Sequence, residues 1–164
     1  MSCTRSRALV IALMVTVGGV SIPAWGAESG KWRGRAVLVT ISEKGSEVGD
    51  KKDHKVWLTE YDGLVFTEVG GDFLANARYQ VTDLTDAGGD MASGGYKTFT
   101  MTDGSKVFAQ YKMKEYNPPL VRGEWKFING TGRYQGITGN GTYEVHQVSD
   151  TVLWDVLEGE YKVP

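Results

Sequence analysis

Two acidic residues near the end of the chain, Glu144 and Asp155, are the first candidates for chemistry in this sequence. They lie in two alternating runs separated by Ser149-Asp150, and a two-residue turn there would place the carboxylates opposite each other. Carboxylates held close together raise the pKa of one of them, which general acid–base catalysis exploits. His146, two residues further along the strand, would lie on the same face of the sheet as Glu144. An outward face carrying solvated acids explains the same pattern, so a catalytic pair requires that both residues face inward.

The other histidine, His54, stands in a loop crowded with charge, where Asp50 and Asp53 could join it on a metal ion. These residues lack a fixed ligand spacing such as that of a His-Glu-x-x-His run, so we predict a solvated loop and no metal site. The chain has no Gly-x-Ser-x-Gly elbow and no cysteine placed as a nucleophile. The glycines between Gly130 and Gly141 lack the Gly-Lys-Ser/Thr ending of a phosphate loop.

Strands with one buried face must position these residues, because alternating runs recur and no segment after residue 30 has a helical period. Asp62-Gly63 and Asp103-Gly104 are the clearest signals for two-residue hairpin turns, and the second would place Phe99 opposite Phe108. The predicted strands cover Trp32–Ile41, Lys55–Tyr61, Leu64–Val69, Asn76–Thr85, Gly95–Thr102, Ser105–Lys114, Leu120–Ile128, Thr142–Val148 and Thr151–Tyr161.

Short turns between so many strands make an antiparallel meander, and closing a meander of this size removes its exposed edges. We therefore predict an all-β fold, a single closed antiparallel β-barrel of about eight strands. A two-sheet β-sandwich is the alternative. A barrel of this size can be filled by side chains or can hold one small ligand. In Leu120–Ile128 the alternation places apolar residues inward and charged residues outward, and we expect the cavity to be lined by Trp57, Trp125, Tyr143 and Trp154.

Residues 1–26 have the features of a cleaved signal peptide. Arg5 and Arg7 precede an apolar run from Ala8 to Val20, which is too short to span a bilayer, and small residues stand before the predicted cleavage site. An uncleaved anchor is the alternative. Residues 27–164 then form one domain without cysteine, which favours secretion into a bacterial periplasm. Loss of the two arginines changes the net charge from −2 to −4, which argues against nucleic acid or an anionic membrane as partner.

The segment from Phe127 to Ile137, FINGTGRYQGI, resembles the glycine signature of plant allene oxide cyclases and dirigent proteins. The continuation through Gly139-x-Gly141 and His146-Gln147 to Leu153-Trp154 looks most like the cyclases. The resemblance implies an eight-stranded antiparallel barrel, often a homotrimer, with an apolar cavity and no cofactor. In those relatives the cavity holds a reactive intermediate, derived from a fatty-acid epoxide in the cyclases and a phenoxy radical in the dirigent proteins.

This chain departs from the cyclase pattern on the first strand. The cyclases place an acidic residue there, whereas Lys31–Ile41 offers Arg33 and Arg35 and no acid, so the cyclase activity is not carried over. Gly30-Lys31-Trp32 also looks like the Gly-x-Trp opening of lipocalins, although a tryptophan that closes one end of a barrel explains it equally well.

Three functions fit these expectations. The first is a secreted barrel that binds a small apolar or aromatic molecule in its lumen. The second is a cofactor-free isomerase or cyclase acting on a lipid-like or phenolic substrate, with Glu144, Asp155 or Arg35 as the polar group. The third is a non-catalytic scaffold or surface protein with a filled barrel. We favour binding over catalysis because no residue pattern compels a reaction.

Overall fold

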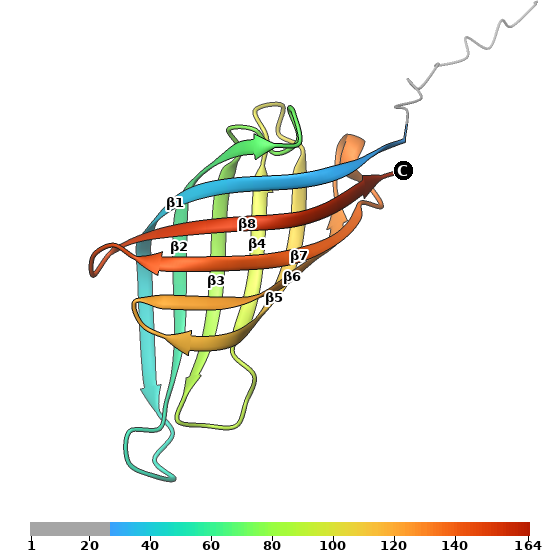
Figure 1. Cartoon of the computed structure of the whole chain (residues 1–164). Coiled ribbons are helices and arrows are strands. Elements are labelled where there is room, and N and C mark those ends of the chain that lie inside the picture. Colours follow the sequence, from blue (N-terminus) through green and yellow to red (C-terminus); the bar gives the residue numbers. More distant parts are fainter. Residues whose placement is uncertain (1–26) are drawn as a thin grey trace, which may run out of the picture.

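The computed structural model describes residues 27–164 as one closed antiparallel barrel (Figure 1). Each strand pairs with its neighbours in sequence, and β8 closes the barrel against β1. The predicted barrel is thus confirmed, and the alternative β-sandwich is wrong. The predicted signal peptide, residues 1–26, lies outside the described residues. The strands are β1 (Glu28–Glu47), β2 (Lys55–Val69), β3 (Arg78–Ala87), β4 (Gly94–Thr100), β5 (Lys106–Asn117), β6 (Leu120–Gly130), β7 (Thr138–Gln147) and β8 (Val152–Val163), and a short 3-10 helix, η1 (Gly132–Tyr134), joins β6 to β7.

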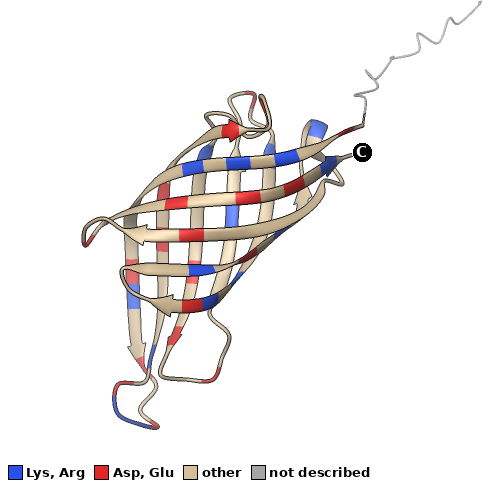
Figure 2. Cartoon of the chain, viewed as in Figure 1, with Lys and Arg blue, Asp and Glu red and all other residues tan. Residues whose placement is uncertain are grey.

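The alternation along β6 shows how the sequence builds the wall. Trp125 and Phe127 are buried in the lumen, whereas Glu124 and Lys126 between them are exposed, as predicted. Charged residues of both signs are distributed along the strands (Figure 2). Between residues 27 and 164, no helix has the length and apolar character needed to cross a membrane.

Asp62-Gly63 is not a hairpin turn, and this prediction is wrong. The strand β2 runs continuously through it, with Gly63 paired to Leu38 on β1 and to Tyr79 on β3. A Cβ added to Gly63 would collide with the carbonyl oxygen of Val37. The glycine therefore serves close backbone approach in the wall, and the two strands predicted on either side of it are one.

The β4–β5 turn is one residue longer than predicted. The amide of Met101 donates to the carbonyl of Ser105 at 2.9 Å, which leaves a three-residue loop whose last residue, Gly104, has a φ of 81°. Phe99 consequently pairs with Val107, and the predicted pairing with Phe108 is wrong. Phe99 lies in the lumen, whereas Phe108 belongs to the other face of β5.

The β7–β8 turn is also one residue longer than predicted. The amide of Val148 donates to the carbonyl of Val152 at 2.9 Å, so the loop spans residues 149–151. This shift pairs Val145 with Asp155 and places Glu144 opposite Val156. Because neighbouring residues of a strand point to opposite faces, Glu144 and Asp155 lie on different sides of the barrel wall.

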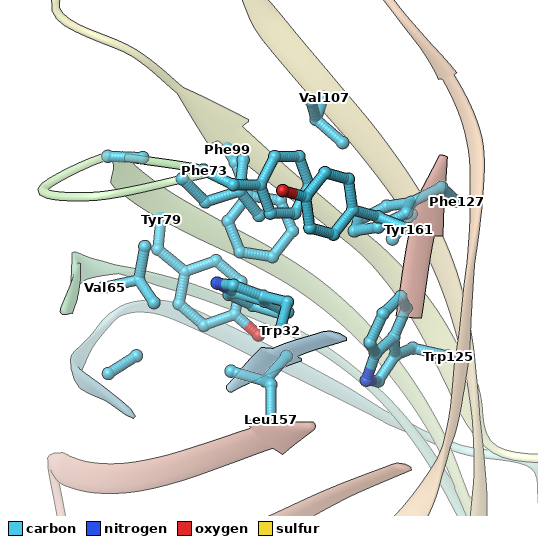
Figure 3. Packing of buried hydrophobic residues seen from close by; sticks show 14 of the residues in the cluster. Trp32, Val65, Phe73, Tyr79, Phe99, Val107, Trp125, Phe127, Leu157 and Tyr161 are labelled. Atoms are coloured by element: carbon cyan, nitrogen blue, oxygen red, sulfur yellow. The ribbon is translucent and has the colours of Figure 1, made fainter. Parts of the chain in front are cut away.

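Aromatic side chains fill one half of the lumen (Figure 3). Phe73, from the segment between β2 and β3, enters this end and stacks on Tyr161 with ring centroids 3.7 Å apart. The Trp32 ring meets Phe73, Phe99 and Trp125 edge-on, with centroids 5.8–5.9 Å apart. Edge-to-face contacts of this kind add to the burial of each ring. This half of the barrel is a packed core, closed at its end.

Candidate functional site

The other half of the lumen contains a cavity of about 310 Å³. It opens at the end of the barrel where the β5–β6 and β7–β8 loops lie, since Pro118, Pro119 and the exposed Asp150 are among its lining residues. The volume lies at the lower end of the range of small-molecule pockets. Its apolar and aromatic walls come from seven of the eight strands and include Leu38, Trp57, Tyr61, Val81, Tyr111, Met113, Val121, Tyr143 and Leu153.

A buried ion pair forms the floor of the cavity. The Lys97 ammonium on β4 lies 2.8 Å from Oδ2 of Asp155 on β8 and 2.5 Å from the Tyr79 hydroxyl on β3. Tyr79 donates to the same Asp155 oxygen at 2.7 Å. The Lys97 and Asp155 side chains are only 2% and 0% exposed, so each charge depends on the other for compensation.

Three tyrosine rings surround the Lys97 ammonium. Its nitrogen lies 4.4 Å from the ring centroid of Tyr143, 4.9 Å from that of Tyr111 and 5.3 Å from that of Tyr79. These distances are typical of cation–π attraction, which is stronger where water is excluded. Burial raises the pKa of Tyr79 and Tyr111 well above the ordinary value, with a further rise from the nearby carboxylates. Both hydroxyls therefore stay protonated and act as donors.

A second buried carboxylate, Asp83 on β3, lies higher in the cavity wall. It accepts hydrogen bonds from the Tyr111 hydroxyl and, at 2.7 Å, from the Thr85 hydroxyl. Both of these donors are neutral. Burial and the charge of Asp83 together raise the pKa of the neighbouring Tyr61 to about 12. The negative charge of Asp83 thus contributes to the raised pKa of the tyrosines around the cavity.

Two polar atoms of the cavity wall have no hydrogen-bond partner among the described residues. They are Oδ1 of Asp155 and the hydroxyl of Tyr143, both buried. Buried polar groups in proteins are nearly always paired, and an exception often marks a functional position. Since both residues line the cavity, a bound molecule could supply the missing partners.

The structure brings Trp57, Tyr143 and Asp155 together around this cavity. Trp125 was predicted to line it as well, but this residue is buried in the filled half, where its indole donates to the carbonyl of Thr142 at 2.9 Å. Trp154 was also placed in the lining and belongs instead to the outer face of β8, since it is half-buried and neighbours the fully buried, lumen-facing Asp155. Two of the four predicted lining residues therefore lie elsewhere.

Glu144 and Arg35 both lie on the outer wall. Glu144 accepts from Arg122 at 2.7 Å and contacts His146 at 2.6 Å. Arg35 forms an ion pair with Glu68, and its guanidinium lies 5.6 Å from the ring centroid of Trp154. The predicted pairing of Glu144 with Asp155 is wrong because the longer β7–β8 turn places the two side chains on opposite faces.

Lys97, Tyr79 and Asp83 are site residues that the sequence analysis did not identify. The signal was present for Lys97, because it has the same alternation phase as the buried Phe99 on β4. A lysine in the inward phase of a barrel strand needs a buried counter-charge. Asp155 supplies it from a strand 58 residues further along the chain.

A histidine clamp connects two loops at the open end of the barrel. His54, at the end of the β1–β2 loop, contacts Asp50 through Nδ1 at 2.5 Å and Asp86 on β3 through Nε2 at 2.8 Å. Asp86 also accepts from the amide of Met91 in the β3–β4 loop at 2.8 Å. Figure 1 shows both loops at the same end of the barrel. Throughout residues 27–164, no group of three or more His, Cys, Asp and Glu side chains is arranged to hold a metal ion.

The His54 clamp should make stability depend on pH. Hydrogen bonding to Asp50 and then to Asp86 raises the pKa of His54 above that of a free histidine. The stabilisation is therefore full below about pH 6.5, the unfolded value, and is lost as pH rises through the raised folded pKa. We expect the melting temperature of the protein to exceed that of His54→Gln most at pH 6 and least at pH 9. A difference that stays constant over this range would contradict the clamp.

Barrels of similar fold occur among the solved structures of known proteins. No known family model and no curated protein sequence matches this chain. Among solved structures, the pterocarpan synthase dirigent protein GePTS1 aligns with a TM-score of 0.55 and 12% identity, over 87% of this chain and 89% of that chain. The pterocarpan synthase dirigent protein PsPTS1 aligns with a TM-score of 0.50 and 13% identity, over 84% of this chain and 94% of that chain. The fold is dirigent-like.

The dirigent-like barrel agrees with the fold implied by the glycine motif from Phe127 to Ile137. In the structure this motif ends β6 and turns through η1 at the closed end. The Asn129 side chain accepts from the amide of Gly130 at 2.8 Å and from that of Gly136 at 3.4 Å, which ties the turn together. The motif thus builds the closed end of the dirigent-like barrel, away from the cavity.

Proposed function

We propose that this protein binds a small molecule with an apolar or aromatic body in the open half of its barrel. The observation that carries the proposal is the cavity of about 310 Å³, which has aromatic walls, a polar floor and an opening to solvent. Burial of a ligand against such walls contributes roughly 25 cal/mol per Å² of apolar surface. The lumen is filled in only one half, which argues against a scaffold with a fully packed interior.

Trp57 reports on this binding. Among the described tryptophans, it alone lines the cavity, while Trp154 lies on the outer wall. A panel of small aromatic and lipid-like molecules should contain ligands that change the tryptophan emission of the protein, with the change lost in Trp57→Phe and kept in Trp154→Phe. Filling the cavity with Val121→Trp should weaken the same ligands at least about tenfold. A well-folded protein that responds to no member of the panel would contradict the proposal.

A cofactor-free isomerase or cyclase is the second candidate. Asp155 and Lys97 on the cavity floor favour it, because a buried carboxylate beside an ammonium and a tyrosine hydroxyl could exchange protons with a bound substrate. The aligned dirigent proteins are called pterocarpan synthases, which supports this candidate. The remaining polar candidates, Glu144 and Arg35, lie on the outer wall and take no part in this candidate activity. Turnover of a cavity ligand that is lost in Asp155→Asn, with binding retained, would support it.

A further inference from the structure

The charges that line the cavity are strongly unbalanced. Four carboxylates, those of Glu43, Asp83, Asp150 and Asp155, face a single cation, Lys97. The ammonium of Lys97 is already paired with Asp155 at the floor. The cavity wall therefore carries three more negative than positive charges. A cavity with one sign of charge and low-dielectric walls concentrates its field on whatever enters.

Among the residues that the structure describes, none of the three remaining carboxylates has a counter-ion. Within residues 27–164, no lysine or arginine lies within ion-pair distance of Glu43, Asp83 or Asp150. The hydrogen-bond partners of the buried Asp83 are two neutral hydroxyls. No lysine or arginine among residues 27–164 therefore offsets an ionised Asp83, and a cation in the cavity would do so.

The walls are also suited to a cation. Trp57, Tyr61, Tyr111, Tyr116 and Tyr143 present five aromatic side chains to the same space. The floor already shows that such rings accept an ammonium, because Lys97 lies 4.4 Å from the ring centroid of Tyr143. The unpaired atom of the floor, Oδ1 of the fully buried Asp155, is an acceptor. An N–H donor from a ligand can satisfy it, whereas a carboxylate cannot.

We propose that the cavity selects ligands that carry a protonated amine or quaternary ammonium group on an apolar or aromatic body. This inference rests on the proposed binding function and names its ligand class. The apolar body would lie against Val81, Met113 and Val121, and the cationic group would lie among the aromatic rings near Asp83 and the rim carboxylates. Molecules with a carboxylate or phosphate would be rejected by the same charges.

Three probes that share one skeleton separate charge from shape. Binding of 2-phenylethylamine, 2-phenylethanol and phenylacetate would be measured by calorimetry and ligand-observed NMR at pH 7 with the full chain. We expect the amine to bind at least about tenfold more tightly than the carboxylate, with the neutral alcohol between them. Added salt should reduce this preference, because part of it comes from the exposed rim.

Two variants test which carboxylates of the cavity cause the preference for the amine. The rim variant Glu43→Gln/Asp150→Asn and the buried variant Asp83→Asn should each reduce the preference for the amine over the carboxylate at least about threefold. The rim variant changes exposed residues, so it should fold even if Asp83→Asn does not. The matched control is Glu144→Gln on the outer wall, which should leave the preference unchanged.

The outcomes separate the two proposals. If the alcohol binds while the amine shows no advantage over the carboxylate, the inference on ligand charge is wrong and the proposed binding function stands. A preference for the amine that persists in both carboxylate variants would also overturn the inference. If a folded protein binds none of the three probes, neither this inference nor the binding of small aromatic molecules holds.

Discussion

Replacing Asp155 by alanine should lower the free energy of unfolding by about 3–5 kcal/mol, since this is the cost of breaking a buried ion pair by removing one partner. The change leaves the Lys97 ammonium buried without its counter-charge and removes an acceptor from the Tyr79 hydroxyl. Urea denaturation followed by tryptophan emission measures the free energy. The effect would be among the largest that a single substitution produces in this barrel.

Two further variants control this prediction. Glu144→Ala removes a carboxylate on the neighbouring strand that pairs with Arg122 on the exposed outer wall, and should cost no more than about 1 kcal/mol. Replacing both partners, Lys97→Met with Asp155→Leu, should recover most of the stability lost in Asp155→Ala, because no unpaired charge remains. If Asp155→Ala proves no more destabilising than Glu144→Ala, the buried pair does not hold the floor together.

Phe73→Ala should destabilise the barrel by a similar amount, about 3–5 kcal/mol, because it empties the centre of the closed half. The Phe73 ring stacks on Tyr161 and meets Trp32, Phe127 and Tyr134 edge-on. Since Phe73 does not line the cavity, ligand binding to the folded variant should be unchanged. Denaturation and titration of the same sample measure both quantities.

Phe66→Ala is the matched control for this change. Phe66 lies on β2 close to Phe73 in sequence, but its side chain is 49% exposed on the outer wall. Its loss should therefore change the free energy of unfolding by about 0.5 kcal/mol or less. Equal effects of the two substitutions would contradict the assignment of Phe73 to the packed closed end.

The alternation of side chains was sufficient to predict the closed barrel but not the register of its hairpins. Asp103-Gly104 and Ser149-Asp150 were both interpreted as two-residue turns, and both turns contain a third residue. One residue is enough to exchange the two faces of a strand, which explains why Glu144 was placed beside Asp155. Turn length depends on the twist that the closed barrel imposes, and the sequence of the turn alone does not reveal it.

The site illustrates the same limit. Trp57, Tyr143 and Asp155 could be named from the sequence as residues for a lumen, whereas the pairing of Lys97 with Asp155 depends on two strands that face each other across the closed barrel. The division of the lumen into a filled and an open half depends on Phe73, which belongs to the segment between β2 and β3 and inserts into the lumen. The alternation along β4 indicates that Lys97 faces inward, but neither its partner nor the position of Phe73 leaves a local pattern in the chain.

Thiol labelling at two lumen-facing valines tests the central claim most directly, because Val145 lines the cavity and Val107 is buried in the filled half. The single natural cysteine, Cys3, would be replaced by serine so that each variant carries one thiol. Val145→Cys should react with a small maleimide at least about tenfold faster than Val107→Cys, and a bound ligand should slow it. Equal labelling rates in the two variants, or a Val145→Cys rate that no ligand changes, would contradict a ligand cavity in the open half of this barrel.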